Sequence, residues 1–150
     1  MLRRAFSLTE LVIVLVVISV AAGLALPAYS SATGRYRAHG GAQQLVADLD
    51  RAAAHARTTA TQVDVAFLSA PDRVEFSGLP DRLDAAVDHV LQLEGDPFSV
   101  RLVTADFGGS AAFTLNELGV PSSGGTIELD GGGRKWILDV DPTTGEASIR

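Results

Sequence analysis

One carboxylate, Glu10, stands at the head of a long apolar run near the N-terminus of this 150-residue chain. The run extends from Leu11 to Leu26 without a charged residue, and a charge deep in a bilayer costs about 2.5–3.5 kcal/mol on insertion scales. The chemistry that suits such a residue is ion pairing, because a partner removes the cost of leaving the charge alone. The alternative is that Glu10 lies at headgroup level and reaches water by snorkelling.

The other residues with reactive side chains show no catalytic spacing. His39, His55 and His89 lie far apart, and none has a neighbouring carboxylate together with a Ser or Cys nucleophile. We expect all three to be solvated surface residues. The glycine clusters do not match a phosphate loop, and the run 131–133 is placed where a tight turn between two strands needs it. No enzyme, no catalytic residue and no cofactor are predicted.

Composition narrows the function further. The chain has no cysteine, which excludes a disulfide framework, a thiolate metal site and a cysteine nucleophile. Its formal net charge of −6 repels nucleic acid phosphates. Asp139, Asp141 and Glu146 are close in sequence but lack the spacing of a calcium loop, so we expect them to line a solvated hairpin. No metal site is predicted.

The apolar segment is long enough to cross a membrane as one helix. The stretch from Phe6 to Leu26 has 21 residues, and at about 1.5 Å per residue it spans roughly 31 Å, close to the hydrocarbon thickness of a bilayer. A plain anchor, a cleaved secretory signal ending near Gly23–Ala25, and a twin-arginine signal at Arg3–Arg4 are alternatives. Glu10 at the head of the run is unexpected in either export signal.

The N-terminal residues also form a recognisable pattern. A short basic leader (1–5) precedes Phe6, Glu10 follows four residues later, and about 20 apolar residues come next. This pattern resembles the prepilin-type signal of type IV pilins and of the pseudopilins of type II secretion, and residues 25–29 resemble the segment that closes the pilin transmembrane part. The chain departs from the pattern at Ala5, where the family usually has Gly before the cleavage site.

The resemblance implies roles for the N-terminal residues. Prepilin peptidase would cut between Ala5 and Phe6 and methylate the new amine of Phe6, and Glu10 of one subunit would pair with the Phe6 amine of its neighbour. The implied partners are other pseudopilins or pilins, the prepilin peptidase/methyltransferase and an inner-membrane assembly platform.

The segment after the apolar run predicts an amphipathic helix. Glycines at Gly34 and Gly40–Gly41 interrupt it, so we expect a bent or locally loosened helix there. The apolar stripe is expected to dock on a sheet and consists of Ala42, Leu45, Val46, Leu49, Ala53 and Ala56. The expected polar face consists of Gln43, Gln44, Asp48, Asp50, Arg51, His55 and Arg57.

From residue 61 the pattern changes to the alternation of β-strands. Val63, Val65 and Phe67 fall on one face of the first strand, and Trp136 alternates with Leu138 as a core residue of a later one. Turn residues separate the strands. The expected strands are 62–67, 73–76, 87–93, 99–103, 111–115, 126–129, 135–140 and 146–149. The fold class is therefore α+β, a long N-terminal helix packed on a small antiparallel β-sheet ectodomain.

Three segments of this ectodomain carry a second resemblance. Phe113–Gly119, Gly124–Leu129 and Trp136–Ile149 resemble the H-type minor pseudopilin domain, also called GspH/FimT-like. The implied function is a minor pseudopilin, a structural subunit of the periplasmic pseudopilus of a type II protein secretion system. The alternative is a FimT-like minor pilin that serves type IV pilus assembly or DNA uptake.

DNA uptake would require a basic surface near the C-terminus. Only Arg134, Lys135 and Arg150 are available to form one, and Glu146 stands where a basic residue would serve phosphate contact. Three cations on an acidic background give weak and salt-sensitive binding, so nucleic acid is not expected as a partner.

The predicted organisation has four parts. Residues 1–5 are the leader, 6–27 a transmembrane helix, 28–60 an amphipathic helix that continues into the ectodomain, and 61–150 a GspH-like β-rich periplasmic domain. The expected location is the bacterial inner membrane, crossed once with the N-terminus in the cytoplasm, and a periplasmic filament after assembly. The positive-inside rule supports this orientation through the basic leader, although Arg35 and Arg37 beyond the span weaken the asymmetry.

Overall fold

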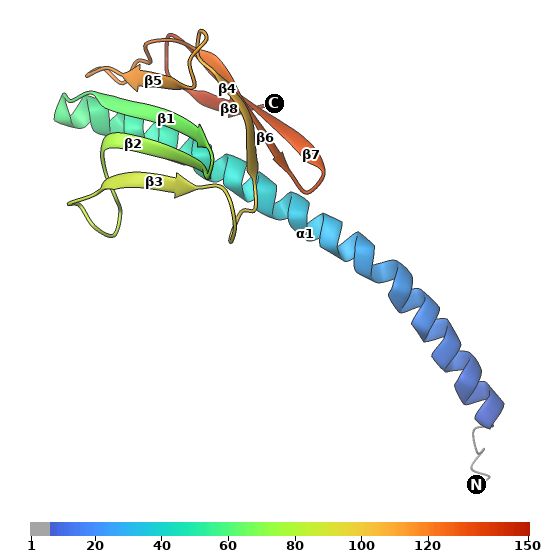
Figure 1. The fold of residues 1–150 in the computed structure, drawn as a ribbon. Coiled ribbons are helices and arrows are strands. Elements are labelled where there is room, and N and C mark those ends of the chain that lie inside the picture. Colours follow the sequence, from blue (N-terminus) through green and yellow to red (C-terminus); the bar gives the residue numbers. More distant parts are fainter. Residues whose placement is uncertain (1–6) are drawn as a thin grey trace.

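A long helix leads into a β-rich domain. A computed structural model describes the backbone of residues 7–150 and the side chains of residues 7–22 and 32–150. Helix α1 (Leu8–Thr59) has 52 residues, and Figure 1 shows its first half projecting alone while its second half runs along the domain. The helix ends at Ala60, which adopts the left-handed conformation and donates its N–H to the Ala56 carbonyl.

Eight strands form two antiparallel sheets of four strands each, in the orders β3-β2-β1-β5 and β4-β6-β7-β8. Consecutive strands pair as hairpins at β1–β2, β2–β3, β6–β7 and β7–β8, whereas β5 returns to pair with β1. The strands are β1 (Val63–Ser69), β2 (Asp72–Pro80), β3 (Asp88–Gln92), β4 (Arg101–Asp106), β5 (Ala112–Leu115), β6 (Gly125–Gly131), β7 (Arg134–Val140) and β8 (Ala147–Ile149).

The second half of α1 and the inner faces of both sheets share one hydrophobic core. The expected apolar stripe of the helix is buried in it, with Val46 partly buried at its margin. Alternation places Val63, Val65 and Phe67 of β1 in the same core. Figure 1 shows the helix lying across both sheets, which is how it covers their apolar faces. The predicted α+β fold is confirmed, and each expected strand is present within a few residues of its predicted bounds.

Of the bent or locally loosened helix expected at the glycines, the local loosening is wrong, whereas Figure 1 shows that α1 follows a curved course. Helix α1 continues without a break through Gly34 and Gly40–Gly41. A Cβ at Gly41 would lie 3.0 Å from Val100 Cγ2, and one at Gly34 would lie 3.1 Å from the Gly132 Cα. Gly34 and Gly41 therefore let the β-domain approach the helix closely.

The turn between β6 and β7 is seated directly on the helix. Gly132 adopts a φ of 62°, and a Cβ there would overlap the backbone of Gly34 and Arg35. A glycine is required at this position by both its backbone conformation and its surroundings. The hairpin tip thus marks the level at which α1 leaves the domain.

Candidate functional site

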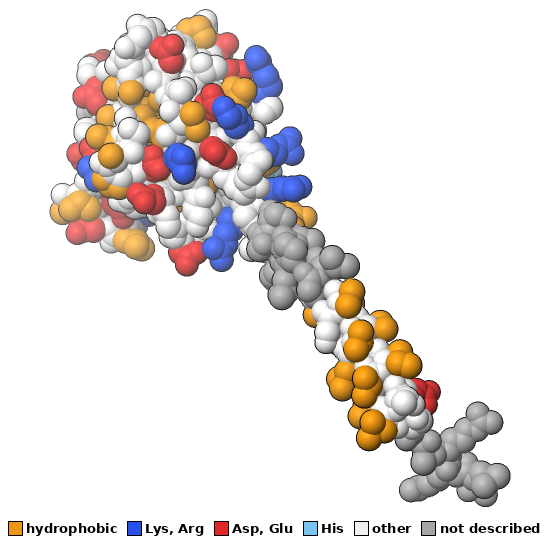
Figure 2. All heavy atoms as spheres, turned by 45° about the vertical axis from the view of Figure 1, so that its right-hand side comes forward, with side chains coloured by type: hydrophobic (Ala, Val, Ile, Leu, Met, Phe, Trp, Pro, Cys, Tyr) orange, Lys and Arg blue, Asp and Glu red, His pale blue; other side chains and the backbone are white. Residues whose placement is uncertain are grey.

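The projecting half of α1 is an uncovered apolar surface. From Leu8 to Ala22 every side chain is exposed, and Figure 2 shows hydrophobic side chains around this part of the helix with one acidic group near its end. Leu8 is 78% exposed and Val17 61%. Within the described residues, nothing in the helix satisfies both the length and the apolarity that crossing a membrane requires. The predicted span 6–27 extends at both ends into residues whose side chains are not described.

Glu10 lies in the first turn of α1, where a negative charge is favoured by the helix dipole. Its side chain is exposed and makes no hydrogen bond or ion pair with the described part of the chain. Ser7 stands at the N-cap position without a capping side-chain bond, and its hydroxyl hydrogen-bonds the Thr9 hydroxyl at 2.5 Å instead. The carboxylate is consequently free to meet a group from another molecule. The predicted cleavage pair, Ala5 and Phe6, lies outside the described residues.

A buried ionic cluster was not foreseen. Asp48 is fully buried, and its carboxylate oxygens lie 3.1 Å from Arg82 Nη2 and 3.1 Å from His89 Nε2. The other ring nitrogen of His89 lies 2.9 Å from Asp81 Oδ2, and Gln44 donates to Asp48 at 3.1 Å. The expectations that Asp48 lies on the polar face of the helix and that His89 is a solvated surface residue are both wrong.

The cluster joins α1 to the β2–β3 connection. Each of the two contacts between His89 and a carboxyl group needs a proton between nitrogen and oxygen to be a hydrogen bond. Both are hydrogen bonds only if both ring nitrogens are protonated, or if one ring nitrogen and the carboxyl group facing the other are protonated. The Leu83 backbone N–H, followed by His89, lowers the pKa of the Asp81 carboxyl from its ordinary value. With no nucleophile or cavity of its own among the described contacts, the cluster is suited to fastening the helix to the sheet.

The other two histidines lie at the edge of the core. His39 is half-buried, and its ring contacts Trp136 at a tilt of 34° with centroids 4.8 Å apart. The Arg134 guanidinium lies on the same Trp136 ring, 4.7 Å from its centroid. Trp136 was expected in the core and is partly buried against it. His55 is also half-buried, so none of the three histidines is fully solvated as predicted.

The three cations weighed for DNA binding are engaged within the domain. Lys135 pairs with Glu128 at 2.5 Å, and this hydrogen-bonded partner raises the pKa of the Lys135 ammonium. Arg150 pairs with Asp139 at 2.8 Å, and Arg134 lies on the Trp136 ring. The two ion pairs contribute little stability, but each one reduces the positive potential that Lys135 or Arg150 offers to a phosphate, whereas Arg134 has no acid partner among the described residues.

The three acidic residues that were considered as calcium ligands, Asp139, Asp141 and Glu146, make separate contacts. Asp141 accepts the backbone N–H groups of Thr143 and Thr144 in the β7–β8 turn, and these bonds, Thr144 first, lower the pKa of the Asp141 carboxyl. Asp139 is held by Arg150, whereas Glu146 lies near Asp50 and helps to raise the pKa of that carboxyl, after burial. In the part of the chain that is described, no group of three or more His, Cys, Asp or Glu residues is arranged to hold a metal ion.

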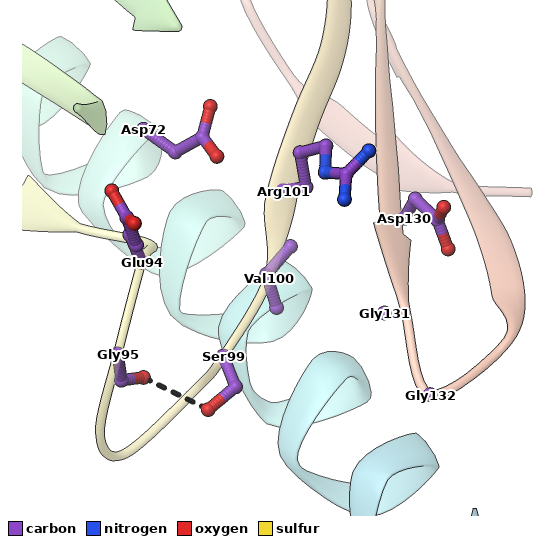
Figure 3. Close-up of a pocket in the computed structure, with 9 residues that line it drawn as sticks. All are labelled: Asp72, Glu94, Gly95, Ser99, Val100, Arg101, Asp130, Gly131 and Gly132. Carbon is purple, nitrogen blue, oxygen red and sulfur yellow. Dashed lines mark hydrogen bonds between the residues drawn. The ribbon is translucent and has the colours of Figure 1, made fainter. Parts of the chain in front are cut away.

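An open crevice of about 400 Å³ lies between the β3–β4 connection and the β6–β7 hairpin. Figure 3 shows Asp72 and Glu94 on one side, with Arg101 and Asp130 on the strands of the other. The Ser99 hydroxyl donates to the Gly95 carbonyl at 3.2 Å, and the Ser99 backbone N–H donates to the same carbonyl at 2.6 Å. One cation among three carboxylates provides neither a nucleophile nor a general base aligned with one, so the crevice supports no catalytic reading.

Comparisons with known proteins agree with this architecture. The family model described as type II transport protein GspH matches residues 41–144, more than half of the chain. The crystal structure of the type IV minor pilin FimU from Pseudomonas aeruginosa strain PAO1 is similar in fold, with a TM-score of 0.54 at 15% sequence identity. The match covers 77% of this chain and 88% of the FimU chain. No curated protein sequence matches the chain.

Proposed function

The chain belongs to the GspH family of type II transport proteins, and from this premise we propose that it is a minor pseudopilin, a structural subunit of the periplasmic pseudopilus of a type II secretion system. The observation that carries the proposal is the division of α1. Its second half is buried in a GspH-type domain, whereas its first half is an exposed apolar helix with a free carboxylate in its first turn. A structural subunit needs both parts and no active site.

The exposed half of α1 supports two successive environments. Before assembly it would anchor the protein in the inner membrane, with the N-terminus in the cytoplasm and the β-domain in the periplasm. After assembly it would pack against the same helices of neighbouring pseudopilins. Transfer from lipid to a helix bundle costs little hydrophobic energy, because lipid tails are as apolar as the side chains, and packing then favours the bundle.

Glu10 would set the register of this bundle. The proposed partner is the N-methylated amine of Phe6 on the neighbouring subunit, produced when prepilin peptidase cuts after Ala5. A buried pair of this kind adds little net stability, but an unpaired charge in an apolar bundle is strongly disfavoured. Neighbours that are shifted along the axis leave both charges alone, so pairing selects one arrangement. The free state of the Glu10 carboxylate in the isolated chain supports this role.

A type IV pilus minor subunit is the second candidate, and the similarity in fold to FimU favours it. Deletion of the gene separates the two machines. Loss of protein secretion with pili intact supports the pseudopilin, and loss of pili or of transformation with secretion intact supports the pilin. The DNA-uptake form of this candidate gains little from Lys135 and Arg150, because both are paired with acids.

The central experiment complements such a deletion with Glu10→Leu and, as a matched control, Glu10→Asp. We expect Glu10→Leu to enter the membrane at the normal level but to lose incorporation into the filament, measured by cross-linking to neighbouring subunits in whole cells. Glu10→Asp keeps the charge and should retain part of the incorporation. Normal incorporation of Glu10→Leu would refute the pairing role.

Mass spectrometry of the mature chain tests the processing step independently. We expect a protein that begins at Phe6 and carries one extra methyl group. A chain that still begins at Met1, or one cut near Pro27, would contradict prepilin processing and favour a plain anchor or an export signal.

A further inference from the structure

Three arginines, two on α1 and one on β7, lie at the level where α1 leaves the domain. Arg35 and Arg37 are exposed on the helix, and Arg134 is exposed at the start of β7, just after the hairpin tip that rests on Gly34 and Arg35. We call Arg35, Arg37 and Arg134 the basic collar. Figure 2 shows Lys and Arg side chains gathered along the edge of the domain beside the emerging helix. None of the roles proposed above uses them.

Much of the charge of this collar is not neutralised within the domain. Arg35 makes no hydrogen bond or ion pair with any described residue. Arg37 lies 3.0 Å from Asp96, but both side chains are largely exposed, at 48% and 85%, and such surface pairs are weak. Arg134 contacts the Trp136 ring and has no acid partner in the described structure. The collar can therefore exchange its present contacts for a phosphate at little cost.

The collar lies against two aromatic rings. Arg134 lies over Trp136, and the Trp136 ring contacts the tilted ring of His39, which is one helical turn from Arg35 on the same face of α1. Trp136 Nε1 and His39 Nδ1 are buried and lack any hydrogen-bond partner among the described residues. A flat guanidinium held on an aromatic ring presents its outer N–H groups in a fixed direction, which suits recognition of phosphate oxygens.

The position of the collar along the helix identifies its partner. If the span ends at Pro27, as proposed, Arg35 follows by eight residues of continuous helix, which is roughly 12 Å at about 1.5 Å per residue. The headgroup layer occupies about 5–7 Å of that distance. The remaining gap is within reach of an extended arginine side chain and within the Debye length of about 8 Å at physiological ionic strength.

We propose that Arg35, Arg37 and Arg134 bind the phosphate groups of anionic phospholipids in the leaflet from which α1 emerges, and so hold the β-domain against the membrane before assembly. This inference rests on the proposed membrane anchoring. An anionic headgroup attracts each nearby arginine enough to change surface association roughly fivefold. Tyr36, between two members of the collar and 80% exposed, has the ring and hydroxyl that favour the same interface.

Lipid fits this surface better than nucleic acid does. The collar lies where α1 leaves the domain, so the anchored helix brings a bilayer to it. A duplex approaching from the periplasm would instead meet a domain with an excess of acidic residues. Arg101 on β4 does not extend the basic surface, because Asp72, Glu94 and Asp130 line the same crevice.

The test uses the only tryptophan of the chain, Trp136, as the reporter. The full chain is placed in nanodiscs of phosphatidylcholine, with or without phosphatidylglycerol, that contain a trace of lipid with a spin label on its headgroup. Quenching of Trp136 fluorescence, expressed relative to discs without the label, measures how close the β-domain lies to the headgroups. We expect phosphatidylglycerol to increase the quenching and high salt to reverse the increase.

Two double variants decide whether the collar causes the effect. Arg35→Gln with Arg134→Gln should lose most of the phosphatidylglycerol-dependent quenching. The matched control, Arg57→Gln with Arg150→Gln, removes the same charge elsewhere, with Arg57 roughly 33 Å further along α1, and should retain it. Equal quenching in both lipids, or equal loss in both variants, would overturn the proposal.

Competition and insertion separate the remaining outcomes. If low concentrations of a DNA duplex displace the domain from phosphatidylglycerol discs, the collar binds nucleic acid. If inorganic phosphate alone displaces it, the collar binds the free ion. Either result overturns the lipid assignment. A chain that fails to enter nanodiscs contradicts the anchoring in the proposed function. A chain that enters them without a response to phosphatidylglycerol contradicts only this inference.

Discussion

The two halves of α1 differ both in composition and in surroundings, since the projecting half is the more apolar one. From Ala38 to Ala56 the helix buries one stripe in the core of its own domain, whereas from Leu8 to Ala22 every side chain is exposed. The apolar side chains of the first half can therefore be buried only by other molecules, whereas those of the second half are buried by their own domain. One continuous helix thus carries a surface that is buried in its own domain and an apolar surface that its own domain leaves exposed.

The carboxylates of the two halves also differ in their burial and in their partners. Asp48 is fully buried and is met by Arg82, His89 and Gln44 from the same chain. Glu10 is exposed and has no partner in the described structure. A buried charge requires a partner in either case, so the difference lies in where the partner comes from. Asp48 pairs within its own chain, and Glu10 is available for the pairing with a neighbouring subunit that we propose.

The largest expected effect comes from shortening one leucine in each half. Leu45→Ala removes a fully buried side chain and leaves a cavity, so it should lower the free energy of unfolding by about 3–5 kcal/mol. Leu15→Ala removes a side chain that is 54% exposed and should leave the unfolding of the domain unchanged. Urea unfolding of the full chain in detergent measures both. Similar losses would contradict the division of α1 into two kinds of surface.

Removal of the buried carboxylate ranks next. Asp48→Ala leaves His89 without one acceptor and Arg82 without its acid, and should destabilise the domain by about 3 kcal/mol. Glu10→Ala, its counterpart in the projecting half, should not change the unfolding midpoint. Thermal unfolding followed by circular dichroism compares the two variants. A large loss in Glu10→Ala would show that the projecting half is folded against the domain.

The boundary between the halves can be tested at the hairpin tip. Gly132→Ala combines a positive φ with an overlap on the helix backbone, whereas Gly133→Ala meets the positive φ alone, with open space around it. Gly133→Ala should cost about 1–2 kcal/mol and Gly132→Ala about 1 kcal/mol more. Equal unfolding midpoints for the two variants would mean that the tip is not seated on Arg35.

The smallest expected effect is a change in acid sensitivity. The Leu83 N–H and His89 lower the pKa of Asp81 below its ordinary 3.8, so its ionised form is favoured by folding. Its contribution to stability is present above that value and is lost as the pH falls through the lower pKa of the folded state. Asp81→Asn should therefore flatten the decline of stability below about pH 4. An unchanged slope in urea unfolding at several pH values would argue against this linkage.

Local patterns of the sequence were sufficient for most of the fold. Alternation such as Val63, Val65 and Phe67 located the strands, and glycine and aspartate clusters located the turns between them. The helical stripe that includes Leu45 and Leu49 identified the face that docks on the sheets. These patterns involve residues close together in the sequence, and they predicted the elements correctly because alternation and helical spacing are set by such nearby residues.

Long-range pairings were not predictable in this way. Asp48 and His89 are 41 residues apart, and no local pattern joins them. Two signals nevertheless existed, since Asp48 lies one helical turn from Leu45 and His89 alternates with Leu91 on a buried register. The helical glycines were misread for the same reason: their importance depends on Val100, Phe98 and Gly132, which lie far away in the sequence. The proposed role of Glu10 involves a second molecule and is still a prediction.

The unbroken backbone of α1 couples the orientation of the β-domain to that of the projecting segment. A rotation of the projecting segment about the helix axis therefore rotates the β-domain by the same angle. Inserting one alanine between Ala22 and Ala38 would rotate the domain by about 100° and lift it by about 1.5 Å relative to Glu10. Inserting a full turn would nearly restore the azimuth, so the helical phase between these two points sets which side of the domain faces outward.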